Sequence, residues 1–193
     1  NSGSKSAHLN DAIRHCQGSI IVSFDGDDRY VPTRVSRLVE AFEADPSMRA
    51  VYSGYDLIDE HGKRIGPGRV PHPPAGMDPA RWFARVDAFA SGSTLAVHRE
   101  VFELFDPLDP AIHEDVVLPF RASLLGGVRY LDADLASARR HSGSLTADDE
   151  RFRSLDAYRQ RMLAGIEKAR HQLASRLADL DRAAQSMKAY TDA

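Results

Sequence analysis

Three aspartates crowd around one glycine directly after a short apolar run, and this is the group in the sequence with the clearest chemical potential. Segment 19–24 is rich in β-branched residues, which is typical of a strand buried on both faces. Asp25, Asp27 and Asp28 follow at its carboxyl end, the edge at which open α/β sheets bind ligands. Carboxylates this close repel one another unless a cation lies between them, and Mg²⁺ or Mn²⁺ commonly combines such carboxylates with substrate phosphates. The pattern predicts a divalent metal that holds a diphosphate. The alternative is an exposed acidic turn, because Asp and Gly favour turns.

Two later segments carry further reactive side chains. Glu114 and Asp115 precede a stretch expected to be helical from about residue 116, where acidic side chains also interact favourably with the helix dipole. His141 follows Arg139 and Arg140 after the last expected strand. Taken alone, the two segments are explained as well by helix capping and by an exposed surface.

Alternating strands and helices must position these groups. We expect strands at 19–24, 50–55, 94–97, 128–131 and 135–138, and helices at 7–17, 33–45, 79–86, 100–104 and 116–125. Residues 59–62 are typical of a hairpin turn, and 66–79 of a loop. The alternation predicts an α/β fold, with a mostly parallel sheet flanked by helices.

A long amphipathic helix is expected after about residue 150. Its apolar residues recur at spacings of three, four or seven, from Leu155 to Met187. The helix either packs back on the preceding domain, or forms a coiled-coil contact that makes a homo-oligomer, or links to another domain.

The bulk composition is that of an ordinary globular protein. The 193 residues carry a formal net charge of −3, which argues against a nucleic-acid partner. Cys16 is the only cysteine, so no internal disulfide can form. No stretch is long and apolar enough for a transmembrane segment, and we expect the protein in the cytoplasm or at the periphery of a membrane.

With these segments in hand, residues 3–146 resemble the inverting glycosyltransferases of family 2, which have the Rossmann-like GT-A fold. The acidic turn looks like the family's DXD-type metal motif, and Pro32 opens the next helix as it usually does there. Glu114-Asp115, followed by Arg121, is similar to the family's "ED…R" stretch. Segment 139–144 is similar to its closing "R-x-H-x-x-S" segment. The family's first strands would precede Asn1, so the resemblance implies a domain that lacks its N-terminal part.

The resemblance implies a donor side of the site. The donor would be a nucleoside-diphosphate sugar, bound together with Mn²⁺ or Mg²⁺. Asp27 would bind the metal and His141 would complete the metal site. Asp25 would contact the ribose or a metal-bound water, and Arg139 would pair with a phosphate oxygen.

It also implies an acceptor side, where a hydroxyl group receives the sugar. Asp115 would be the general base, and Glu114 would orient the acceptor or hold Asp115. Ser91, Gly92 and Ser93 would lie beside the acceptor.

We therefore expect a GT-A domain over 1–147 and a helical extension over 148–193. A non-catalytic scaffold that assembles through the C-terminal helix is the main alternative. A nucleotidyltransferase would also place acidic residues at a strand end, but it would not require segments 114–115 and 139–141.

Overall fold

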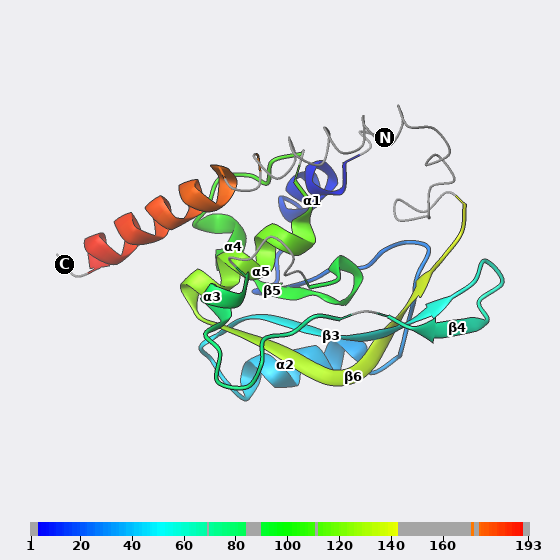
Figure 1. Ribbon diagram of the computed structural model, residues 1–193. Coiled ribbons are helices and arrows are strands. Elements are labelled where there is room, and N and C mark those ends of the chain that lie inside the picture. Colours follow the sequence, from blue (N-terminus) through cyan, green and yellow to red (C-terminus); the bar gives the residue numbers. More distant parts are fainter. Residues whose placement is uncertain are drawn as a thin grey trace, which may run out of the picture.

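The computed structural model is built on a curved, mixed sheet with helices on both faces (Figure 1). It describes residues 4–68, 70–83, 90–110, 112–142, 171 and 174–190. Its strands, in chain order, are β1 (Ile20–Val22), β2 (Arg29–Tyr30), β3 (Met48–Ile58), β4 (Arg64–Pro67), β5 (Ala96–His98) and β6 (Gly127–Arg139). They are arranged β1-β5-β3-β6-β2, and β4 pairs with β3 as the second arm of a hairpin.

The directions of the strands bring three carboxyl ends to one edge of the sheet. β5 is antiparallel to both β1 and β3, while β3 and β6 are parallel. β1, β3 and β6 therefore run the same way. The α/β class is confirmed, but β3–β6 is the one parallel pair among the described strands, so the expectation of mostly parallel pairing is wrong for this part of the chain. The reason is that β5 runs in reverse between β1 and β3, and that β2 and β4 return antiparallel along their partners.

The two central strands are longer than their local patterns predict. β3 has 11 residues and β6 has 13, where we expected one short strand and two short strands. The pairing register shifts from Ser53 opposite Leu131 to Gly54 opposite Asp134. The extra β6 residues are accommodated as an irregularity in the ladder, so one continuous strand forms instead of two.

Helices bury the two faces of the sheet in separate cores. The helices are α1 (Lys5–Ile13), α2 (Arg34–Glu43), α3 (Pro79–Phe83), α4 (Glu100–Glu103), α5 (Glu114–Leu125) and a C-terminal helix that includes residues 174–190. On one face, Leu38 and Phe42 of α2 pack with Val51 and Ala96. On the other face, α5 packs with α3 and the opposite side of β3 (Figure 1). No helix in the described residues is long and apolar enough to cross a membrane.

The C-terminal helix docks on α5 through buried charge. Arg121 of α5 is paired with Asp179 at 3.2 Å, and their side chains are 2% and 0% exposed. Arg182 then bonds Asp179 at 2.9 Å and Asp106 at 2.6 Å. The sequence left three arrangements of this helix open, and the structure shows residues 174–190 packed through one face against the domain. The expected boundary between 147 and 148 lies outside the described residues.

Candidate active site

The acidic turn after β1 meets the end of β6. Antiparallel pairing of β2 with β6 holds the turn there, with Arg29 opposite Ser137. Asp27 Oδ2 lies 3.0 Å from His141 Nε2, and Asp28 Oδ1 accepts the backbone N–H of Arg139 at 2.9 Å. The structure thus brings together two predicted metal ligands that are 114 residues apart in the sequence.

A lysine joins the other acidic residue of the turn to the start of α5. Lys5 Nζ lies 2.6 Å from Asp25 Oδ1 and 2.9 Å from Glu114 Oε1. Burial opposes the positive charge on Lys5, but Glu114 and Asp25 outweigh it and raise the pKa of the ammonium. Lys5 is therefore charged at every physiological pH, and it forms an ion pair with both carboxylates.

Lys5 was missed by the sequence interpretation because nothing local marks it. Its place is set by the docking of α1 on segment 108–112. Ser6 Oγ donates to the Ile112 carbonyl at 2.5 Å, and the Asn10 side chain bonds both backbone groups of Leu108 at 2.7 and 2.8 Å. These contacts place the first residue of α1 beside the first residue of α5.

The predicted acceptor-side segment packs directly on this ion pair. A Cβ on Gly92 would collide with Glu114 Oε1 and would lie 2.8 Å from Lys5 Nζ, so any side chain there would displace the ion pair. Burial raises the pKa of Asp28, and a hydrogen bond from Ser93 opposes part of that rise. The Ser93 Oγ also lies 3.4 Å from Ser91 Oγ. Segment 91–93 therefore contacts both the acidic turn and the start of α5.

A second residue missed from the sequence is a buried arginine behind the turn. Arg34 is 1% exposed, and its guanidinium lies 4.5 Å from the ring centres of both Phe24 and Tyr30. Its Nη2 donates to the Ser93 carbonyl at 2.8 Å. Burial lowers the pKa of Arg34, and Tyr30 and two aspartates of the turn oppose that shift. The sequence did hold one signal for its burial. Arg34 lies four residues before Leu38, so both are on the same, inward face of the helix.

The neighbouring carboxylates of the turn are electrostatically different. The hydrogen bond to His141 lowers the pKa of Asp27, with a further contribution from Arg139. Burial raises the pKa of Asp28, and the charges of Asp25 and Asp27 add to that effect. Of these two neighbours, Asp27 is consequently the one whose anionic form is stabilised.

The predicted phosphate-binding arginine is already engaged with the backbone. Arg139 Nε donates to the Asp27 carbonyl at 2.8 Å, and Nη1 donates to the carbonyls of Asp59 and Glu60 at 3.0 and 2.8 Å. A phosphate contact would have to be added to these bonds. The role of Arg139 in binding a phosphate oxygen stays a prediction.

The predicted base lies in the first turn of α5. The Asp115 carbonyl accepts the Ala90 N–H at 2.9 Å, and its side chain is partly exposed. Ligand atoms of His113, Glu114 and Asp115 lie within 4.8 Å of one another. Because Glu114 is already paired with Lys5, this trio fits a positioned base better than a metal site.

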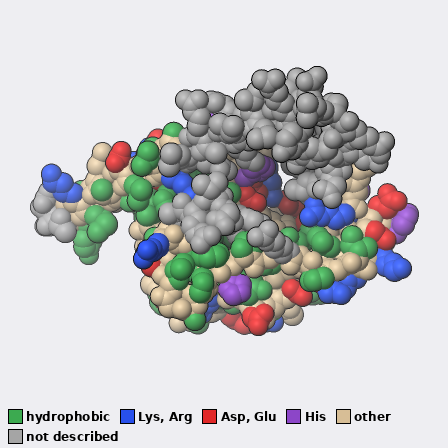
Figure 2. Space-filling view, in the orientation of Figure 1, with side chains coloured by type: hydrophobic (Ala, Val, Ile, Leu, Met, Phe, Trp, Pro, Cys, Tyr) green, Lys and Arg blue, Asp and Glu red, His purple; other side chains and the backbone are tan. Residues whose placement is uncertain are grey.

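The residues at the acidic turn fit a divalent cation. Asp27 offers a carboxylate oxygen and His141 an imidazole nitrogen, and the two side chains are 49% and 31% exposed. Such a pair leaves coordination positions for water and phosphate oxygens. In the space-filling view, acidic and histidine side chains gather in a hollow above the sheet (Figure 2).

Comparison with known proteins gives the family. Residues 1–105, just over half of the chain, match the sequence model of Glycosyl transferase family 2. The chain belongs to this family. It is 28% identical over 133 residues to an uncharacterized glycosyltransferase of Nostoc sp., an alignment that covers 66% of this chain and 41% of that protein.

A solved structure confirms the GT-A-like fold. The crystal structure of S. aureus TarS residues 1–349 in complex with UDP-GlcNAc matches with a TM-score of 0.51 at 16% identity. The match covers 93% of this chain and 53% of that one. The family 2 chain thus spans about half the length of the TarS 1–349 chain and about two fifths of the Nostoc protein.

Proposed function

We propose that this family 2 chain contributes the catalytic half of a metal-dependent glycosyltransferase that transfers a sugar, with inversion, from a nucleoside-diphosphate sugar to an acceptor hydroxyl. The observation that carries the proposal is the convergence of two clusters at one sheet edge. Asp27 meets His141, and Asp25 meets Glu114 through Lys5. The TarS complex with UDP-GlcNAc supports a nucleotide sugar as donor.

The donor side is assigned to the acidic turn. Asp27 and His141 would hold Mn²⁺ or Mg²⁺, which when bound supplies positive charge for the departing diphosphate. The hydrogen bond between them keeps Asp27 ionised and orients the imidazole. Arg139 fixes the backbone of the turn, and its charge lies close to the proposed diphosphate.

The acceptor side is assigned to the start of α5 and to segment 91–93. Asp115 would accept the proton of the acceptor hydroxyl as the hydroxyl oxygen attacks the anomeric carbon. Glu114 is held by its ion pair with Lys5 and packs closely on Gly92, which has no side chain. From this place Glu114 would position Asp115. Attack opposite the leaving diphosphate in one displacement gives inversion. Ser91 and Ser93 would contact the acceptor.

Substitution of Asp27 tests the donor side. The Asp27→Ala variant should lose Mn²⁺-dependent binding of UDP by calorimetry while remaining folded, with only a small fall in thermal stability, because its side chain is half exposed and carries little packing. The Asp11→Ala variant is the matched control, since Asp11 is an exposed acid on α1. Undiminished Mn²⁺-dependent affinity in Asp27→Ala would remove this residue from the site.

Substitution of Asp115 tests the acceptor side in the whole protein. Asp115→Asn should keep the affinity for donor and cut turnover by about 10²–10⁴-fold, the usual contribution of a general base. Turnover near that of the wild type would assign the proton transfer to another group.

A further inference from the structure

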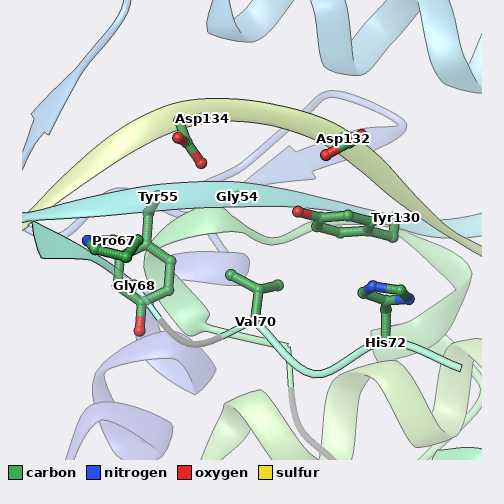
Figure 3. Close-up of a pocket in the computed structure, with 9 residues that line it drawn as sticks. All are labelled: Gly54, Tyr55, Pro67, Gly68, Val70, His72, Tyr130, Asp132 and Asp134. Atoms are coloured by element: carbon green, nitrogen blue, oxygen red, sulfur yellow. The ribbon is translucent and has the colours of Figure 1, made fainter.

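A cavity of about 350 Å³ lies apart from both clusters, on the face of the sheet that packs against α5. β3, β6 and the segment that follows β4 form it, and the residues that matter below are Gly54, Tyr55, His72, Tyr130, Asp132 and Asp134 (Figure 3). Its size is within the range of small-ligand sites. None of the site assignments above uses it.

One side of the cavity is a fixed aromatic surface. The rings of His72 and Tyr130 are stacked, with centroids 4.8 Å apart and planes 6° apart. Tyr52 supports this pair from beneath, because its ring lies 5.3 Å from Tyr130 and its hydroxyl donates to the Pro71 carbonyl at 3.3 Å. Such a flat face suits the C–H side of a sugar ring, which is apolar on its faces and polar at its edge.

Polar groups converge above a glycine floor. A Cβ on Gly54 would collide with the carboxylate of Asp134 and would lie 3.2 Å from the Tyr130 hydroxyl. The carboxylate of Asp134 therefore lies directly over Gly54, next to the hydroxyl of Tyr130. Gly68 is held against the ring of Tyr55, and its N–H donates to the Tyr55 carbonyl at 2.7 Å, which fixes the opposite wall.

The charge of the lining selects among ligands. Two carboxylates line the cavity, and the described lining includes no lysine or arginine. Burial raises the pKa of Tyr130, and the charges of Asp132 and Asp134 add to the shift. The Tyr130 hydroxyl therefore stays protonated, and the carboxylates accept hydrogen bonds. Hydroxyl and ammonium groups are favoured as ligands, and carboxylates, sulfates and phosphates are repelled.

We infer that this cavity binds a sugar ring without acidic groups, as a unit of the acceptor remote from the reacting hydroxyl. The inference rests on the proposed function for its place in the reaction. Asp134 pairs opposite Gly54 and Arg139 opposite Ile58, so the cavity lies five residues before the end of β6. That separation is about 16 Å along the strand. Binding at such a distance contributes energy that aligns the reacting unit.

The test uses the 193-residue chain and three probes of different charge, each changed at one position of the ring: methyl β-glucopyranoside, its 2-amino analogue and methyl β-glucuronopyranoside. Binding is followed by ligand-observed NMR. The neutral and amino probes should bind, and the uronate should bind about tenfold more weakly or not at all, since one charge-assisted contact is lost and replaced by repulsion. Equal binding of the three probes, or binding of none, overturns the inference.

Three variants locate the binding. Asp134→Asn should reduce the preference against the uronate, and Gly54→Ala should abolish binding because its methyl group would displace the Asp134 carboxylate. If Gly54→Ala does not fold, His72→Ala replaces it, because His72 is exposed and its loss removes the stacked face. Asp181→Asn, an exposed acid on the C-terminal helix, should bind as the wild type does.

Mn²⁺-dependent UDP binding on the same samples separates the two proposals. If Gly54→Ala or His72→Ala loses the sugar and keeps UDP, the cavity is a distinct subsite. If the wild type binds sugar but not UDP, the proposed donor site is wrong and the cavity stands. Unchanged sugar binding in the substituted cavity overturns its assignment.

Discussion

Asp27 and Asp28 are adjacent in the sequence, but the fold gives their carboxylates opposite environments. Asp27 is half exposed and bonded to His141, which lowers its pKa. Asp28 is more buried and accepts the Arg139 N–H, but burial and the neighbouring charges raise its pKa. The fold therefore stabilises the anionic form of Asp27 and destabilises the anionic form of Asp28.

Replacing Asp28 by Asn should stabilise the protein at pH 7. The folded state keeps the Asp28 proton to a higher pH than the unfolded chain, so the wild type loses stability as the pH rises from the ordinary pKa of 3.8 through the folded value. Asn keeps an oxygen that accepts the Arg139 N–H and carries no charge. We expect a gain on the order of 1 kcal/mol by urea denaturation, and no gain at about pH 3.

Asp27→Asn is the matched comparison and should have the opposite sign. Its carboxylate has a lowered pKa, so its contribution is present above 3.8 and is lost as the pH falls through the folded value. The variant should therefore be less stable than the wild type at pH 7. A gain in Asp27→Asn, or a loss in Asp28→Asn, would contradict this description of the turn.

At the scale of elements, Arg139 ties the end of β6 to two turns. Its guanidinium donates to the Asp27 carbonyl and to the carbonyls of the β3–β4 turn. Lysine has no planar fork and would not reproduce these three bonds. We expect Arg139→Lys to speed amide exchange at 25–28 and 59–62, and to cost about 1–2 kcal/mol of stability. Arg14→Lys, at the exposed C-terminal end of α1, is the control. Exchange rates equal to those of the wild type would show that the turns hold without Arg139.

The local sequence pattern predicted most of the helices and strands, but few of the contacts between them. The hairpin turn at 59–62 is confirmed, with Gly62 at a φ of 85° as such a turn requires. β4 follows it and ends at Pro67, inside the loop expected at 66–79. The start of α2 after Pro32 was also visible. Lys5, Arg34 and the register shift at Gly54 were not, because each depends on a strand or helix distant in the sequence. The motif resemblance supplied the proposed site residues, which neither composition nor periodicity would have selected.

At the scale of the whole molecule, one buried pair holds the C-terminal helix. Removing Asp179 leaves the Arg121 guanidinium buried beside Phe105 with its charge uncompensated. We expect Asp179→Ala to cost about 3–5 kcal/mol, measured as a fall in the midpoint of thermal unfolding. Asp181→Ala, on the exposed face of the same helix, should have little effect. Equal midpoints for the two variants would show that the helix contributes no stability to the domain.

The outer face of the same helix carries an apolar stripe. Leu177, Leu180, Met187 and Tyr190 are 55%, 44%, 69% and 87% exposed. We expect this stripe to join two copies of the chain, because its spacing is that of a helix seam. Leu177→Glu with Leu180→Glu should then yield monomers by light scattering. A monomer before substitution would contradict the pairing and would leave the stripe without a role in self-association.

The contacts that create the site join segments far apart in the chain. Asp27 and His141 are separated by 114 residues, and Ser6 and Ile112 by 106. Loops of this length must close before their contacts contribute stability, so chains with such contacts fold slowly. The site therefore assembles late, after α2 and the β3–β4 hairpin have formed from local contacts. Substitutions at Asp27, Lys5 or His141 should change the rate of unfolding and leave the rate of folding nearly constant.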